Sequence, residues 1–200
     1  MDLTPVTLQE KYVRLEPLSM GHLNQFCDIG LEESIWKWTL SVVRSRDEME
    51  DYIKLALSQQ ERAVGLPFAT LSNIGSDNGT FKVVGSTRFF NIEQAHKRLE
   101  IGHTWIAKPW QRTAVNTEAK YLMLKHAFET MGCQRVEFKT DALNLKSRTA
   151  IQRIGAKEEG ILRKHSISAT GRTRDSVYYS ILDDEWYDGK KRLEKMLGNS

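Results

Sequence analysis

The stretch WIAKPWQRTAVNTEA, residues 105–119, joins a predicted β-meander to a predicted β-α-β crossover. It starts with apolar residues that end a strand, turns through QRTAVN and continues as a helix. A helix that begins here leaves several backbone N–H groups free, and it places Arg112 beside the positive end of the helix dipole. The spacing alone predicts either an anion-binding site or an ordinary strand-to-helix turn.

The residue types in this turn favour the anion-binding interpretation. Thr113, Ala114 and Asn116 are small enough to leave the backbone approachable by a ligand. The Gly-Lys-Ser/Thr signature that serves a nucleoside triphosphate and its Mg²⁺ is missing, so a kinase-like P-loop is poorly supported. We expect a diphosphate that is held without a metal.

Before this stretch, the pattern predicts strands and helices in the order β, α, α, β, β, β. Residues 11–15 alternate like a strand, residues 20–29 look helical, and Ser45 with Glu48 can form a capping box at the start of a second helix. Residues 67–74 and 82–91 are rich in β-forming residues and are separated by GSDNGT, which is typical of a hairpin. Residues 98–106 follow as the third strand of a meander.

After this stretch, a long helix is predicted from about Val115 to Gly132, which can take the left-handed conformation that ends a helix. A strand at residues 134–140, a helix at 145–154, two strands at 157–165 and 173–182 around the turn SATGR, and a C-terminal helix complete the pattern. The whole order predicts an α/β (mixed α+β) protein. Its mixed, mostly antiparallel sheet of about seven strands carries helices on both faces.

Composition narrows the class of protein. Two hundred residues without an internal linker predict one domain, residues 1–200, with 40% hydrophobic and 28% charged residues. No apolar run approaches the roughly 20 residues of a membrane span, and the N-terminus resembles neither a signal nor a transit peptide. Two cysteines and a net charge of +3 without a basic stripe favour neither a metal site nor nucleic-acid binding. We expect a cytoplasmic protein.

Two further groups of residues have the chemistry of a site. Asn144 and Ser147 stand at the head of the second crossover helix and can face the same sheet edge as residues 111–116. The alternative is that Asn144 is only a helix N-cap. Glu100 and His103 lie in the strand that leads to the turn, where a carboxylate often belongs only to the solvated face.

At these residues the sequence resembles the GNAT superfamily of acetyl-CoA-dependent N-acetyltransferases, in particular the RimJ/RimL type that acetylates ribosomal-protein N-termini. The resemblance covers nearly the whole chain. Its main stretches are KYVRLEPLSMGHL, VVGSTRFF, LEIGHTWIAKPWQRTAVNTEA, HAFETMGCQRVEFKTDALNLKSRTAIQRIGAKEEG and DSVYYSILDDEW. It implies the GNAT fold and acetyl-CoA as co-substrate, with no metal.

The resemblance also implies where acetyl-CoA binds. The family's Q/R-x-x-G-x-G/A loop, whose amides hold the CoA pyrophosphate, matches residues 111–116. Gln111 is kept, but Ala114 and Asn116 stand at positions where Gly or another small residue is usual. A positive φ at Ala114 would cost about 1 kcal/mol or more. The implied cofactor-binding residues are Trp105, Ile106, Gln111, Arg112, Thr113, Ala114, Val115, Asn116, Thr117, Asn144 and Ser147.

The family's chemistry implies catalytic roles for three residues. Glu100 aligns with a Glu often proposed as the general base, and His103 is a second candidate because an imidazole titrates near neutrality. Many members place a Tyr general acid where this chain has Ile151, so Ser147 or a water must protonate the leaving thiolate. Trp36 and Trp38 either wall a pocket for the amine or anchor a helical layer of the core.

The resemblance therefore implies transfer of an acetyl group from acetyl-CoA to a primary amine by direct attack in a ternary complex. The amine belongs to a protein or peptide N-terminus, an amino acid or a small molecule. A non-catalytic module that binds CoA or acyl-CoA is the main alternative, and an enzyme for longer acyl donors is another. We expect no nucleic-acid or membrane partner, and a monomer or homodimer.

Overall fold

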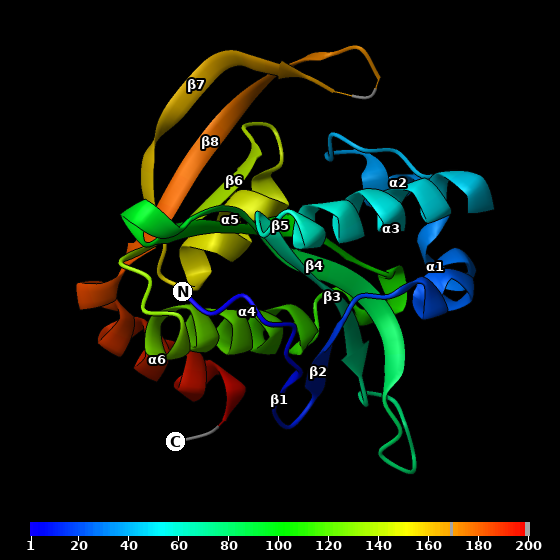
Figure 1. Cartoon of the computed structure of the whole chain (residues 1–200), viewed down its shortest axis with the longest axis horizontal. Helices are drawn as coiled ribbons and strands as arrows, with labels where there is room; N and C mark the ends of the chain where they lie inside the picture. The colour runs from blue at the N-terminus through cyan, green and yellow to red at the C-terminus, as the bar shows by residue number, and fades with distance from the viewer. Residues whose placement is uncertain (169, 199–200) are drawn as a thin grey trace.

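The chain is folded around one twisted sheet, shown in Figure 1. The structure is a computed structural model that describes residues 1–168 and 170–198. The strands lie in the order β1-β2-β3-β4-β5-β6-β8-β7, and β5 and β6 are the parallel neighbours within an otherwise antiparallel sheet. The strands are β1 (Leu8–Gln9), β2 (Val13–Pro17), β3 (Gly65–Ser72), β4 (Lys82–Glu93), β5 (Arg98–Ile106), β6 (Arg135–Asp141), β7 (Lys157–Ile167) and β8 (Thr173–Leu182).

Helices cover both faces of this sheet. The α-helices are α1 (Leu23–Gly30), α2 (Glu33–Trp36), α3 (Arg46–Glu61), α4 (Val115–Lys125), α5 (Leu145–Arg153) and α6 (Asp183–Leu197). Helices α1 to α3 pack over β3, β4 and the end of β5 in one hydrophobic cluster, while α4 to α6 pack on the opposite face in a larger one. Among the described helices, none is both long and apolar enough to cross a bilayer.

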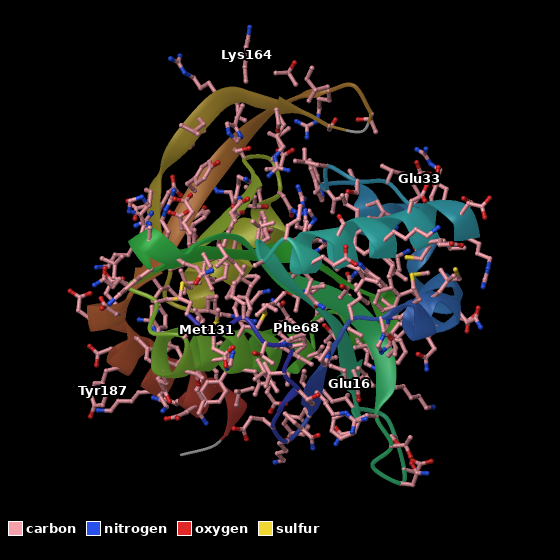
Figure 2. The ribbon with its side chains drawn as sticks, in the orientation of Figure 1. Glu16, Glu33, Phe68, Met131, Lys164 and Tyr187 are labelled. Atoms are coloured by element: carbon pink, nitrogen blue, oxygen red, sulfur yellow. The ribbon has the colours of Figure 1, made fainter. Side chains whose placement is uncertain are left out.

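Side-chain alternation in β5 explains how one strand serves both layers. Leu99 and Ile101 are buried in the cluster that includes α4. Glu100 and Gly102 alternate with them and face the other side, because successive side chains of a strand point to opposite faces. In Figure 2, Phe68 and Met131 lie inside the molecule, whereas Tyr187 lies at its surface. The sheet therefore carries a polar position, Glu100, on the face that does not pack against α4.

The predicted element order is confirmed, with local differences. The sheet has eight strands because the two-residue β1 pairs Leu8 with Leu15, a bridge too short to leave a pattern in the sequence. Ser45 accepts a hydrogen bond from the Glu48 N–H at 3.2 Å, but the Glu48 carboxylate accepts from Arg44 N, so only half of the capping box forms. The predicted helix after Val115 continues past Lys125 as a π-helical turn, His126–Thr130. The predicted turn SATGR contains residue 169, which lies outside the described residues.

Candidate active site

The two central strands separate beyond Glu100. β5 and β6 pair in parallel at three positions, where residues 98–100 face residues 135–137. Both strands continue beyond that point, to Ile106 and Asp141, without further pairing between them. The edge of β5 that faces β6 therefore has backbone groups free for a ligand. Because the two strands are parallel, the helices that follow them, α4 and α5, begin at the same end of the sheet.

A β-bulge in β5 lies beside this separation. The register between β4 and β5 shifts between Ser86 and Arg88, so that Thr87 stands opposite His103 and Thr104. His103 has a φ of +48°, a left-handed conformation that is unusual for a residue other than Gly and is held here by its surroundings. The hydroxyl oxygens of Thr87 and Thr104 lie 2.8 Å apart. Lys120 of α4, which is buried, donates to the Thr104 hydroxyl at 2.8 Å. These bonds fix the bulge from the α4 side.

Residues 111–117 form a cradle in which the N–H groups of residues 112–114, 116 and 117 have no acceptor among the described residues. Gln111 Nε2 donates to the carbonyl of Ile106 at 2.8 Å and so fixes the loop against the end of β5. Within the described residues, Val115 N donates to the Thr113 hydroxyl at 3.3 Å, and Glu118 N donates to Ala114 O at 2.9 Å. The N–H groups between them, at the first turn of α4, have the geometry that binds an anion.

The backbone conformation of Ala114 shows whether this residue, in place of the usual Gly, strains the loop. Its φ is −65° and its ψ is −15°, an ordinary right-handed conformation in which a Cβ costs nothing. The left-handed position of the loop is instead Arg112, at φ +64°. The residues present therefore fit a diphosphate, because the departure from Gly at Ala114 leaves the backbone geometry unstrained.

The start of α5 supplies the second helix terminus at this edge. Asn144 is its N-cap, and the side-chain oxygen accepts a hydrogen bond from Ser147 N at 3.2 Å. Asn144 is therefore a helix N-cap, and this bond leaves the amide nitrogen of its side chain available. Ser147 is half-buried one turn into the helix. Ile151, where many relatives have Tyr, is buried in the core.

Glu100 is a buried carboxylate at the point where β5 and β6 separate. Its exposed fraction is 3%, and its Oε2 accepts from Asn91 Nδ2 at 3.1 Å and lies 3.5 Å from Lys139 Nζ. Burial raises the pKa of Glu100, and the positive charge of Lys139 and the Asn91 hydrogen bond counteract part of that rise. A carboxylate with a raised pKa has more affinity for a proton than an exposed one.

His103 has the opposite electrostatic setting. Burial, together with the positive charges of Arg88 and Lys139, lowers the pKa of His103 to about 3. Its ring packs against Phe90 with centroids 4.8 Å apart. The imidazole is therefore neutral at physiological pH and has little tendency to take up a proton.

Two tryptophans near the bulge, Trp36 and Trp105, belong to the hydrophobic core. Trp36 is 2% exposed, donates from Nε1 to Gly30 O at 2.7 Å and packs against Tyr52, so it is a core anchor. The side chain of Trp105 lies in the same cluster, which leaves only its backbone for a cofactor. A cavity of about 20 Å³, the size of one water, is lined by Trp36, Thr39, Leu40, Ser41, Tyr52, His103 and Trp105.

Trp38 is not among the residues that line this cavity. Its ring is half-buried, and the guanidinium of Arg172 sits 5.7 Å from its centroid. Arg172 belongs to the end of the long β7–β8 hairpin, which Figure 1 shows arching toward α2 and α3. The structure therefore brings Trp38 next to the hairpin and separates it from Trp36.

Sequence reasoning missed Lys120 and Lys139. A lysine in a helix or on an alternating strand looks like part of a solvated face, so neither gave a signal. Lys139 could have been suspected only from the register that places residue 137 beside Glu100. Burial lowers the pKa of Lys120 to about 7, a shift that no local sequence pattern predicts.

The chain belongs to the GNAT acetyltransferases: residues 13–157 match the family model described as an acetyltransferase (GNAT) domain. A relative from Bacillus subtilis (strain 168), named "Putative ribosomal N-acetyltransferase YdaF", is 36% identical over 107 residues. That match covers 54% of this chain and 57% of the relative, so it spans little more than half of either protein.

Solved structures share the fold over a longer part of the chain. A GCN5-related N-acetyltransferase from Brucella melitensis is 28% identical, with a TM-score of 0.86 over 96% of this chain and 86% of that one. Mycobacterium smegmatis RimJ, solved in complex with CoA-disulfide, has a TM-score of 0.82 over 98% of this chain and 97% of that one. At 20% identity, this second likeness concerns the fold alone.

Proposed function

We propose that this protein is an N-acetyltransferase that moves an acetyl group from acetyl-CoA to a primary amine by direct attack in a ternary complex. The observation that carries the proposal is the position of Glu100, a buried carboxylate with a raised pKa at the point where β5 and β6 separate. A general base is needed there because an ammonium ion cannot attack a thioester until it loses a proton.

The cradle and the strand edge support acetyl-CoA as the donor. The free N–H groups of residues 112–114, 116 and 117, with the Arg112 side chain, suit the pyrophosphate. The unpaired edge of β5 at residues 104–106 can orient the acetyl carbonyl and stabilise the oxyanion of the tetrahedral intermediate. Asn144 and Ser147, at the start of α5, are suited to the pantetheine arm and the thiol.

The residues divide the steps of the reaction among them. Glu100 takes the proton of the amine, directly or through a water, and the amine nitrogen attacks the acetyl carbon. The intermediate then collapses with cleavage of the C–S bond, and the second proton that the nitrogen loses passes through Ser147 or a water to the thiolate of CoA. Because the pKa of His103 is lowered to about 3, we assign the general base to Glu100 rather than to His103.

The acceptor is an amine on a peptide or protein N-terminus, an amino acid or a small molecule. The name of the Bacillus subtilis relative, a ribosomal N-acetyltransferase, supports the first of these and a cytoplasmic setting. Nothing in residues 1–168 or 170–198 favours the non-catalytic alternative, since Ala114 has an ordinary backbone conformation and the candidate base is buried.

Calorimetric titration of the purified protein with acetyl-CoA, and separately with CoA, tests the donor. We expect micromolar dissociation constants, about −8 kcal/mol. A panel of amines, peptides with free N-termini included, is then incubated with acetyl-CoA, and each product is identified by a mass increase of one acetyl group. A folded protein that binds neither acetyl-CoA nor CoA would refute the proposal.

A further inference from the structure

Arg174 of β8 is a buried arginine whose Nε has no hydrogen-bond acceptor among residues 1–168 and 170–198. Its exposed fraction is 5%, and its Nε atom is sealed from solvent. Burial is the largest effect on its guanidinium and lowers its pKa. A buried guanidinium is unfavourable unless an anion compensates it, so an unpaired one is an exception that calls for a ligand.

The register of the sheet places Arg174 on the same face as the proposed base. Lys139 of β6 pairs with Tyr178 of β8, and Asp141 pairs with Ser176, so alternate residues of the two strands share one face. Arg174, two residues before Ser176, continues the row on β8. Glu100 joins this face through the parallel pairing of β5 and β6, and its Lys139 contact confirms it.

The carboxylates on this face are already bonded. Asp141 is 1% exposed, accepts from Leu143 N at 2.9 Å and forms an ion pair with Arg172. Glu100 is paired with Lys139. Asp141 and Glu100 act on Arg174 only as more distant charges.

A second buried arginine on this face is enclosed differently. Arg88 of β4 lies under α3, where its guanidinium sits 4.9 Å from the centroid of the Tyr52 ring and donates from Nη1 to Gln59 at 3.1 Å, while its Nε and Nη2 have no acceptor among the described residues. The elements α1 to α3 cover this part of the sheet, and they pack over β3, β4 and the end of β5 rather than over β8. Arg174, on β8, therefore lies outside the part of the sheet that α1 to α3 cover, on the same face as the proposed base.

We propose that Arg174 binds a carboxylate carried by the amine acceptor, so that the preferred substrates are amines whose own molecule bears a carboxylate near the reacting nitrogen. This inference rests on the proposed function. A guanidinium binds a carboxylate through two parallel N–H···O bonds, which fixes the orientation of the substrate as well as its charge. The carboxylate belongs either to a free amino acid or to an acidic side chain close to a peptide N-terminus.

The test compares acceptors that differ only in the carboxylate. One arm pairs free amino acids with their amides, and the other pairs C-terminally amidated peptides with Glu or Gln at the second position. The wild-type protein is expected to favour the carboxylate in one arm, and that arm identifies the source. Transfer to carboxylate and amide acceptors with equal kcat/KM would overturn this inference alone, whereas no transfer to any amine would overturn the proposed function.

Variants connect the preference to Arg174. Arg174→Gln is expected to raise KM for the carboxylate acceptor about 10- to 100-fold and to leave the KM of its amide and the affinity for acetyl-CoA nearly unchanged. Arg174→Lys keeps the charge but lacks the forked guanidinium, so its KM for the carboxylate acceptor should lie between those of the wild type and Arg174→Gln. Arg163→Gln, at an exposed position of β7, is the matched control and should behave as wild type. Equal losses with both acceptors, or weaker acetyl-CoA binding, would assign Arg174 to another role.

Both variants should fold. Arg174→Gln removes a buried charge without breaking an ion pair, and Arg174→Lys keeps a positive charge at the same position. Thermal unfolding of each variant in the absence of ligand checks this. If Arg174→Gln were unfolded, Arg174→Lys and the wild-type acceptor preference would still decide the matter, since neither depends on the glutamine variant.

Discussion

Lys139 places its ammonium nitrogen 3.5 Å from the carboxylate of Glu100, across the junction of the parallel strands β5 and β6. The pairing opposes the effect of burial on the same carboxylate, so the two influences together set the pKa of Glu100. If Glu100 is the base, its protonation state controls how much enzyme is competent at a given pH. Replacing Glu100 and replacing Lys139 should therefore change the pH dependence of kcat in different ways.

Glu100→Gln should lower kcat about 100-fold or more, because an amide cannot accept the amine proton. The affinity for acetyl-CoA should hardly change, since Glu100 lies on the face away from α4. Wild-type kcat should fall as the pH drops through the raised pKa of Glu100, and the variant should lose that dependence. Glu137→Gln, the neighbour in register, is the control: it should keep the wild-type kcat at high pH and move the acidic limb to lower pH, because the charge of Glu137 raises the pKa of Glu100. An unchanged rate at neutral and mildly acidic pH would remove Glu100 as the base.

Lys139→Met should move the acidic limb of the kcat profile to higher pH. Removing the positive charge leaves the burial of Glu100 unopposed, so the pKa of Glu100 rises further and the active carboxylate is lost earlier as the pH falls. Rates measured from mildly acidic to mildly alkaline pH check this. A limb that stays in place, or that moves to lower pH, would show that a group other than Glu100 controls the reaction.

Ala114 and Arg112 should respond in opposite ways to replacement by Gly. Ala114→Gly relieves no strain, because φ is already −65°, so CoA binding should stay unchanged while the free energy of unfolding falls by about 0.5–1 kcal/mol. Arg112→Gly relieves the positive φ of +64° but removes a cation, so stability should hold while acetyl-CoA binding weakens about tenfold. Calorimetry and urea unfolding separate the effects. Weaker CoA binding by Ala114→Gly would contradict this loop geometry.

Lys120→Met should stabilise the protein most at neutral pH and below. Burial lowers the pKa of Lys120 to about 7 in the folded chain, against 10.5 as its ordinary value. Between these values the unfolded chain binds a proton that the folded chain does not, so the free energy of unfolding of the wild type rises with pH across that window. The advantage of the variant, a few kcal/mol at most, should therefore shrink from about pH 7 to about pH 10.

Urea unfolding followed by tryptophan fluorescence at several pH values measures this difference. Lys125→Met, at a more exposed position of the same helix, provides the control and should show no such trend. A constant difference between Lys120→Met and wild type across the window would mean that Lys120 keeps an ordinary pKa in the folded state.

The sequence predicts those elements whose pattern is local. Strands β5 and β8 have the expected limits because their apolar and polar residues alternate between clear turns. The order of elements follows from the same patterns, and so does the cradle at residues 111–116. Asn144 is predicted as a helix cap for the same reason, since its partner Ser147 is only three residues away.

The features that the sequence does not predict depend on contacts between segments that are distant along the chain. The left-handed backbone of His103 lies at the bulge between β4 and β5, and the pKa of His103 falls because of burial and, to a smaller extent, positive charges on β4 and β6. Trp36 and Trp38 look alike in SIWKWTL, yet one is buried under α3 and the other faces the β7–β8 hairpin. Likewise, Arg174 Nε has no acceptor among the described residues, while Asp141 pairs with Arg172 and Glu100 pairs with Lys139.

The release of free CoA thiol in the presence of acetyl-CoA and an amine tests the central claim most directly. The account predicts that the wild-type protein releases one thiol for each amine acetylated, and that Glu100→Gln, with unchanged acetyl-CoA affinity, releases it about 100-fold more slowly. Tight binding of acetyl-CoA without thiol release for any amine in the panel would contradict it, and would make the chain a binding module rather than an enzyme.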